Sequence, residues 1–215
     1  MNRAFAACIC LLLLTSAALA EVEVTIYGGF QSVPESNIVI RDADVIADAD
    51  FSEDWQGQSS SAPLYYGIRA TSWWSPTFGL GVDLAHSKLS PKDDDLPAGY
   101  DLIESTDGVN TMTVNAYRRW LNRFGEVTPY IGGGVGLAAP HVEVTNVASE
   151  TFGYQLTGPA ATWVAGARYP INEQVSVFGE YRGTYSANVA DLSTGETLET
   201  DVTTNALNLG LSFNF

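Results

Sequence analysis

The sequence predicts an all-β fold, an eight-stranded antiparallel up-and-down transmembrane β-barrel with four long outer loops and short periplasmic turns. Three observations lead to this prediction. Eight segments alternate apolar residues with polar or small ones, long connections alternate with short ones, and the chain ends on an aromatic residue, Phe215. Such alternation gives each strand one apolar and one polar face, as expected for a wall between lipid and a lumen.

The first element is a predicted secretory signal peptide, residues 1–20. A basic residue precedes an apolar run over residues 4–14, and Ala18-Leu19-Ala20 supplies the small residues of a cleavage site. The run is too short to span a bilayer as a helix. Residues 21–215 then form the predicted outer-membrane β-barrel domain, which lacks cysteine because both cysteines lie in the signal peptide.

The eight predicted strands follow in order, and each has about the length that a tilted strand needs to cross the hydrocarbon layer. They cover residues 22–31, 64–74, 78–86, 110–120, 129–139, 160–169, 175–186 and 205–215. The apolar faces of the first four comprise Val22, Val24, Ile26 and Phe30; Leu64, Tyr66, Ile68, Ala70 and Trp74; Phe78, Leu80, Val82 and Leu84; Met112, Val114, Ala116 and Trp120. Those of the last four comprise Ile131, Val135 and Leu137; Trp163 and Tyr169; Val175, Val177, Tyr181 and Tyr185; Leu207, Leu209, Leu211, Phe213 and Phe215.

The connections between these strands alternate in length. The long ones cover residues 32–63, 87–109, 140–157 and 187–203, and the short ones cover residues 75–77, 121–128 and 170–174. This asymmetry is typical of bacterial outer-membrane barrels with both termini in the periplasm, which is the location we expect. Phe215 would then be the C-terminal aromatic signal by which the barrel assembly machinery recognises such proteins.

A soluble ligand-binding barrel of the lipocalin kind is the alternative, with the apolar face turned inward. Aromatic residues near the strand ends favour the membrane, because Trp and Tyr concentrate at membrane interfaces. These residues are Tyr65, Tyr66, Trp73, Trp74, Trp120, Tyr130, Tyr169, Tyr185 and Phe215.

The polar faces place charged residues in a lumen that eight strands leave just wide enough for side chains. These residues are Glu23, Asp83, Glu180, Arg69, Arg119, Arg168 and Arg182. Because buried charges need partners, we expect a network of ion pairs, in which Glu180 and Arg182 pair through a neighbour. A catalytic or proton-relay role for these groups is the alternative.

The chain is strongly acidic, with a formal net charge of -15 at pH 7. It is therefore a poor nucleic-acid binder. The long connections hold 19 of the 25 Asp and Glu residues, so we expect divalent cations between them and anionic lipopolysaccharide. Solvated acidic loops are the alternative, above all at Asp93-Asp94-Asp95. The glycines of residues 132–136 stay within a strand and lead into no helix, so we find no nucleotide or flavin motif and expect close wall packing instead.

The outer ends of the strands carry the candidate catalytic and metal-binding residues. His141 and Glu143 are two apart, so they share one face of an extended strand, and His86 ends another strand. With loop carboxylates such as Asp101, Glu104 and Asp107 they would form a metal site or an acid–base site. The predicted catalytic residues are His141 and Glu143 with Glu180 in support, and the predicted metal ligands are His141, Glu143 and His86. Isolated surface histidines are the alternative.

Four stretches resemble the lipid A oxidase family of outer-membrane barrels, which are eight-stranded barrels of the OmpA/OmpX type. They are "DGVNTMTVNAYRRW" (107–120), "PYIGGGVGLAAPHVEV" (129–144), "YQLTGPAATWVAGARY" (154–169) and "FGEYRGTYS" (178–186). The resemblance implies oxidation of the proximal glucosamine of lipid A to aminogluconate by molecular oxygen, helped by a divalent metal ion. It supplies no catalytic motif, so the candidate residues above rest on their placement in the strands.

The expected partners are lipopolysaccharide, through its lipid A part, and the lipid of the outer membrane, and we expect a monomer. The alternative function is that of a non-enzymatic OmpA/OmpX-type barrel with a structural or surface-interaction role.

Overall fold

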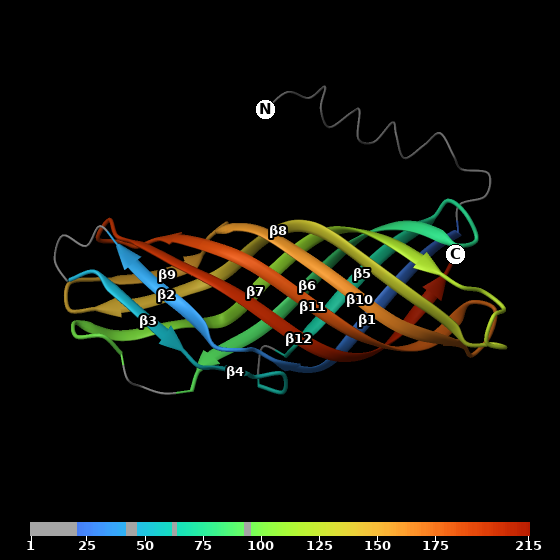
Figure 1. Ribbon diagram of the computed structural model, residues 1–215, viewed down its shortest axis with the longest axis horizontal. Coiled ribbons are helices and arrows are strands. Elements are labelled where there is room, and N and C mark those ends of the chain that lie inside the picture. Colours follow the sequence, from blue (N-terminus) through green and yellow to red (C-terminus); the bar gives the residue numbers. More distant parts are fainter. Residues whose placement is uncertain (1–20, 42–46, 62–63, 93–95) are drawn as a thin grey trace, which may run out of the picture.

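The computed structural model describes residues 21–41, 47–61, 64–92 and 96–215; the predicted signal peptide and the Asp93-Asp94-Asp95 run lie outside them. The described residues form twelve β-strands and no helix (Figure 1). The strands are β1 (Glu21–Ser32), β2 (Ser36–Arg41), β3 (Ala49–Glu53), β4 (Trp55–Gly57), β5 (Tyr66–Trp73), β6 (Phe78–Pro91), β7 (Tyr100–Arg119), β8 (Thr128–Asn146), β9 (Glu150–Tyr154), β10 (Gly158–Pro170), β11 (Val175–Asp191) and β12 (Thr197–Asn214). In the described part of the chain, no helix has the length and apolar character needed to cross a membrane.

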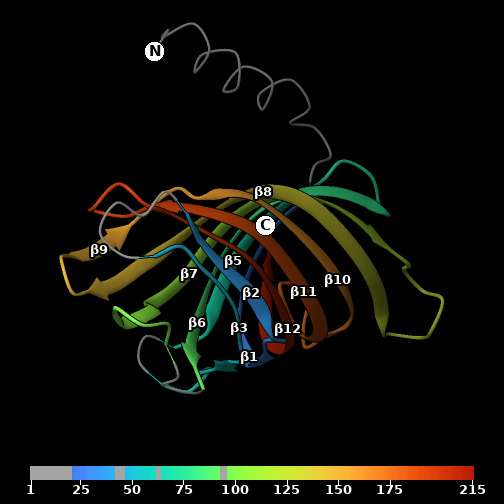
Figure 2. The ribbon, with the colours of Figure 1, turned by 60° about the vertical axis from the view of Figure 1, so that its left-hand side comes forward.

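Eight of these strands close into a ring, in the order β1-β5-β6-β7-β8-β10-β11-β12, and β12 pairs back onto β1. Every pairing around the ring is antiparallel. The closing pair runs from Glu23 opposite Asn214 to Ser32 opposite Asn205, and the Phe215 amide donates to the Val22 carbonyl at 2.8 Å. These eight strands are the eight predicted ones, so the predicted fold class is confirmed. Figure 2 shows them curving around a common axis.

The two faces of each strand divide as predicted. Side chains such as Ile26, Val82 and Leu209 are exposed on the outer wall, whereas Thr25 and Asn115 are buried inside. Five of the predicted interface aromatics also face outward: Tyr66, Trp74, Tyr169, Tyr185 and Phe215. The interface prediction is wrong for Tyr65, Trp73 and Tyr130, which are at most 5% exposed and lie within the barrel. Strand alternation explains the difference, because adjacent residues such as Trp73 and Trp74 must face opposite sides of the wall.

The long connections contain strands rather than loops. β6, β7, β8, β11 and β12 continue beyond their predicted ends. The short strands β2, β4 and β9 pair with these continuations, and β3 pairs with β2. The result is an extension of the barrel at the end opposite the chain's C-terminus, seen on the left of Figure 1. Its interior is apolar and includes Ile38, Ile40, Leu89, Val142, Val144 and Leu198.

Apolar residues change sides where the barrel passes into this extension. On β8, Val135 and Leu137 face outward, but Val142 and Val144, at positions of the opposite parity, face inward. On β12, Leu207 and Leu209 are exposed, whereas Leu198 is buried. An apolar outer wall is expected where the barrel contacts lipid hydrocarbon, and an apolar interior is expected where its outer surface contacts water. The change of side therefore marks the boundary between the membrane and the water above it.

Glycines in the wall make room for the large side chains of the lumen. Each of five inward-facing aromatics lies across a glycine of the neighbouring strand: Tyr27 over Gly67, Trp73 over Gly79, Tyr117 over Gly132, Tyr130 over Gly166 and Phe178 over Gly210. A Cβ atom at Gly67 would lie 2.1 Å from the Tyr27 ring, a distance that no pair of unbonded carbons tolerates. The structural interpretation of the glycine-rich stretch therefore holds at Gly132, and the same packing recurs around the barrel.

We predict that Gly67→Ala destabilises the barrel, because the new methyl group pushes the Tyr27 ring out of its place. The free energy of unfolding should fall by about 1–3 kcal/mol, measured by urea titration of the refolded protein in lipid vesicles. Gly179→Ala is the matched control, since the nearest atom to its Cβ position, on Leu209, is 3.6 Å away. A loss of equal size in both variants would show that stability depends on the backbone flexibility of glycine and not on the space that Gly67 leaves for the Tyr27 ring.

Candidate functional site

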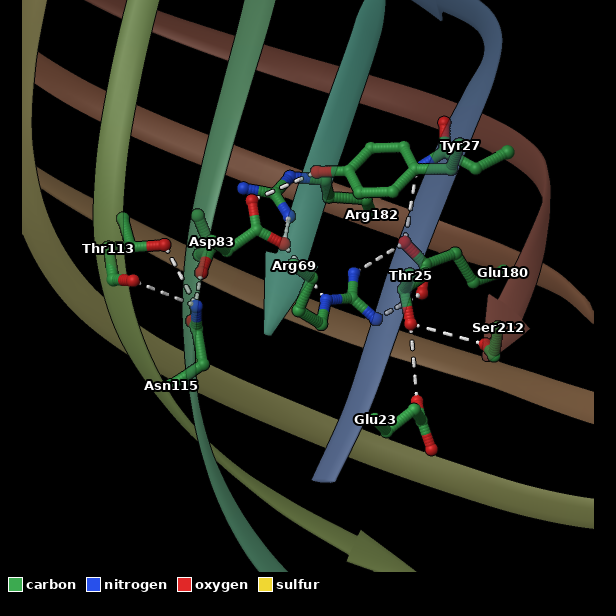
Figure 3. A network of polar contacts seen from close by, with 12 residues as sticks. Glu23, Thr25, Tyr27, Arg69, Asp83, Thr113, Asn115, Glu180, Arg182 and Ser212 are labelled. Carbon is green, nitrogen blue, oxygen red and sulfur yellow. Dashed lines mark hydrogen bonds and ion pairs between the residues drawn. The ribbon is translucent and has the colours of Figure 1, made fainter. Parts of the chain in front are cut away.

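The lumen holds a network of buried charges centred on Arg69 of β5. The Arg69 Nε donates to Asp83 Oδ2 on β6 at 2.9 Å, and its Nη2 and Nη1 donate to Glu180 Oε1 and Oε2 on β11 at 2.8 and 3.1 Å. One guanidinium thus joins two carboxylates from opposite sides of the barrel (Figure 3). Arg69 is 4% exposed, so this planar group is held almost entirely away from water.

Neighbouring side chains complete the bonding of the two carboxylates. Arg182 Nη1 lies 2.9 Å from Asp83 Oδ2, and the Tyr27 hydroxyl donates to Asp83 Oδ1 at 2.9 Å. The Tyr130 hydroxyl donates to Glu180 Oε2 at 2.7 Å. Glu180 and Arg182 are therefore linked through Arg69 and Asp83, as the sequence predicted.

A second group of ion pairs lies toward the end that holds the termini. Arg168 pairs with Glu23, which also accepts a hydrogen bond from the Trp73 indole at 3.1 Å. Arg119 binds Glu21 through two hydrogen bonds of 2.9 and 2.6 Å, and its guanidinium carbon lies 4.0 Å from the centroid of a Trp73 ring. Glu21 is absent from the predicted charge network, although it lies two residues before Glu23 on the same face of β1.

The four lumen arginines therefore face four carboxylates, and the predicted network of ion pairs is present. Because each of the four positive charges has a negative partner, the network fills the lumen without adding a net charge to it. Beyond it, toward the end opposite the termini, the interior of the extension is lined mainly by apolar side chains and encloses a cavity of about 40 Å³. Burial, followed by the negative charge of Glu196, raises the pKa of the Tyr100 hydroxyl in this region.

His141 lies on the outer face of β8, just beyond the membrane-facing part of that strand. Its ring packs edge-on against Phe152 and Tyr154 of β9, with ring centroids 4.5 and 4.8 Å apart. Its Nε2 atom is 3.9 Å from Asp107 Oδ2, and the side chain is almost fully buried. Glu143 follows on the same face of β8 and is half-buried, as the predicted spacing requires.

His86 lies on the outer face of β6, with β7 between it and β8. Its ring stacks on Tyr66 at 5.5 Å, and its Nδ1 lies 2.9 Å from Asn110 Oδ1. In register, His86 is opposite Asn110, which is opposite Ala139, so the two histidines end at a similar level of the wall. Glu180 is elsewhere, in the lumen network.

The predicted metal ligands are thus only partly brought together. His141 and Glu143 share a face, but β7 separates His86 from them. Among the residues that the structure describes, no group of three or more His, Cys, Asp and Glu side chains could hold a metal ion. The side chains as placed do not fit a metal centre, and the carboxylate nearest to His141 is that of Asp107, 3.9 Å from its Nε2.

A groove of about 460 Å³ runs along the outer wall next to these residues. Its floor and sides are mostly apolar and include Ile68, Leu84, Met112, Leu137 and Leu156, and its polar members include His86 and Asn110. It lies where the apolar residues change sides, so the part of the groove nearer the termini faces hydrocarbon. No feature of the strand alternation predicts this groove, because it depends on the side chains of β5 to β8 acting together.

Comparison with known proteins identifies the family of this barrel. A family model described as the outer membrane protein beta-barrel domain matches residues 6–215. The chain belongs to this outer-membrane barrel family. The family accounts for the apolar outer wall and sets the protein in the outer membrane.

Solved structures of outer-membrane barrels are similar to this one in fold. OprG from Pseudomonas aeruginosa matches with a TM-score of 0.52 and 15% identity, over 90% of this chain and 95% of that one. Neisserial surface protein A and the N-terminal barrel domain of Pseudomonas aeruginosa OprF each match with a TM-score of 0.47, over 91% of this chain and 97% of theirs, at 14% and 17% identity. A search of curated proteins found no match.

We predict that Arg69→Met strongly destabilises this outer-membrane barrel, because it leaves two buried carboxylates without their shared partner. The free energy of unfolding should fall by about 3–5 kcal/mol in urea titrations of the vesicle-embedded protein. Adding Glu180→Gln should restore part of that loss, since one uncompensated charge is removed.

Lys92→Met is the control for this prediction. The Lys92–Asp54 pair has an N–O distance of 3.7 Å, and its side chains are 48% and 51% exposed. Solvent screening leaves such a pair a contribution of about 1 kcal/mol or less. Similar losses in Arg69→Met and Lys92→Met would contradict the central place given to Arg69.

Proposed function

We propose that this protein acts on lipid A in the outer leaflet as a monomeric lipid A oxidase-like enzyme, with its termini in the periplasm. The observation that carries the proposal is the outer-wall groove that is lined by His86 and reaches Ala139 of β8, two residues before His141, at the end opposite the termini. In this orientation the apolar part of the groove accepts an acyl chain. The sugar of the same lipid then lies at the level of His141, His86 and Asn110.

The proposed reaction is a two-electron oxidation of the proximal glucosamine at its anomeric carbon. The free hemiacetal loses two electrons and two protons to molecular oxygen, which gives a lactone and hydrogen peroxide. Water then opens the lactone to the aminogluconate, which carries one more oxygen atom than the original sugar. The oxidation itself is supported by the family resemblance of residues 107–186, and no step is assigned to a metal ion.

His141 is the proposed base that takes the proton of the anomeric hydroxyl. Asp107 Oδ2, 3.9 Å from its Nε2, stabilises the imidazolium that forms. Because the Phe152 and Tyr154 rings cover His141, the sugar must displace the exposed Tyr154 ring to reach it. Glu143 is the proposed second polar contact on that face. Glu180 supports the wall from within the lumen network.

A non-enzymatic barrel is the second candidate function, and one observation favours it. The lumen charges are all paired within the barrel. In this case the acidic extension acts as the functional surface, through divalent cations shared with neighbouring lipopolysaccharide.

Mass spectrometry of lipid A separates the two functions. Aerobic cells that carry the gene should contain lipid A heavier by one oxygen atom, and cells without the gene should lack this species. His141→Gln should lower the initial rate at which oxidised lipid A accumulates by about a hundredfold, the usual effect of losing a general base. Gln174→Ala, in an exposed turn at the other end of the barrel, is the control. Identical spectra with and without the gene would contradict the oxidase function and favour the non-enzymatic one.

We also propose that the barrel assembly machinery recognises Phe215, whose side chain is 80% exposed. Phe215→Ala removes the ring but keeps both backbone hydrogen bonds with Val22. We therefore expect less folded barrel in the outer membrane of cells, but unchanged stability after refolding in vesicles. Phe213→Ala, which removes a neighbouring ring, is the control. Normal assembly of Phe215→Ala in cells would contradict the role of the ring.

A further inference from the structure

One arginine of the barrel faces lipid instead of the lumen. Arg118 of β7 precedes the inward-facing Arg119, so its side chain points to the outer wall, where it is exposed. The four lumen arginines each pair with a carboxylate, but in the described part of the chain no carboxylate lies within ion-pair distance of Arg118. Its charge therefore remains available to a ligand outside the protein.

Two aromatic rings hold this guanidinium in place. Its central carbon lies 5.4 Å from the centroid of the Phe78 ring and 5.2 Å from that of a Trp120 ring. Both distances are within the range of cation–π attraction, which orients the cation and leaves its N–H groups free to donate. In register, Arg118 lies opposite Phe78 on β6 and Ile131 on β8, near the end of the barrel that holds the termini.

An apolar groove of about 240 Å³ adjoins Arg118 on the same outer wall. It is lined by Phe78, Ala116, Ile131 and Gly133 along with Arg118. Ala116 and Gly133 are directly opposite each other on β7 and β8. Their small size leaves a depression in a wall otherwise covered by Leu, Val and aromatic side chains. The groove therefore combines a fixed cation at one edge with a surface that suits a hydrocarbon chain.

We propose that this groove is a binding site for a glycerophospholipid of the leaflet at the terminal end of the barrel. The phosphate accepts hydrogen bonds from Arg118, whose planar guanidinium matches two phosphate oxygens at once. One acyl chain lies on Ala116 and Gly133, where apolar contact replaces looser lipid packing. A soluble phosphate would gain nothing from the apolar part of the groove, and so the lipid is the better ligand.

This site is independent of the proposed oxidase activity. It lies near the opposite end of β7 and β8 from the groove beside His86 and His141, and it shares no residue with that groove. Only its leaflet rests on the proposed orientation, in which the terminal end faces the periplasmic leaflet.

Native mass spectrometry of the detergent-solubilised barrel, titrated with phosphatidylglycerol, tests the charge. The wild-type protein should retain one tightly bound lipid, and Arg118→Gln should bind it at least about tenfold more weakly, because the charge-assisted hydrogen bonds to two phosphate oxygens are lost. Arg123→Gln, which removes the same charge from the nearby turn, is the matched control and should bind normally. Equal weakening in both variants would overturn the site in favour of general attraction to positive charge.

A second pair of variants tests the groove while keeping the charge. Ala116→Leu fills the depression and should weaken binding about tenfold, whereas Val114→Leu, on the same outward face but outside the groove, should not. Unaltered binding by Ala116→Leu would overturn the acyl-chain part of the proposal. Displacement of the lipid by an equal concentration of glycerol phosphate, or tighter retention of lipid A than of phosphatidylglycerol, would overturn the choice of ligand. Matching urea midpoints of all four variants establish that the changes concern binding and not folding.

Discussion

The burial of the Arg69 guanidinium between Asp83 and Glu180 is the interaction on which the rest of the barrel depends. Eight strands enclose a lumen too narrow for bulk water, so every charge there must find its partner in the protein. Arg69 meets this need for carboxylates on β6 and β11, which are far apart in the ring. Tyr27, Tyr130 and Arg182 then complete the bonding of the same two carboxylates, and the aromatic rings among them need glycines in the wall behind. The interior is in this sense one connected unit.

The two halves of the barrel satisfy opposite requirements with the same strands. In the membrane half, the outer wall is apolar and the interior is ionic. In the extension, the interior is apolar and packs around Ile40 and Leu89, as in a water-soluble β protein. Both candidate lipid sites lie on the membrane half, one near each of its edges, where polar side chains adjoin apolar wall. The edges are where a lipid offers both its headgroup and its chains.

The sequence was sufficient for those features that depend on the alternation of a single strand. The alternation of odd and even positions along a strand was enough to place Glu180 and Arg69 in the lumen and the leucines of β12 on the outer wall. It failed for the extension, because the apolar residues of β8 change parity between Leu137 and Val142 and the acidic residues around them resemble loops. It offered Asp101, Glu104 and Asp107 together as carboxylates near the histidines, but it could not single out Asp107 as the neighbour of His141, since the register of β7 on β8 shifts between Glu104 and Val109. Contacts across strands, such as His86 on Tyr66, depend on the register between neighbouring strands, which the alternation of one strand does not give.

The closing pair of strands has a consequence for the order of folding. Thr25 of β1 and Ser212 of β12 lie 3.1 Å apart through their hydroxyl oxygens, although 187 positions separate them in the chain. No ring exists until the last strand has been synthesised, and contacts between such distant segments form slowly because a long loop must close. Until then β1 has an open edge that would pair with any extended chain. Other copies of the unfolded polypeptide must therefore be kept from pairing with this edge during export. The edge is removed only when β12 pairs with β1.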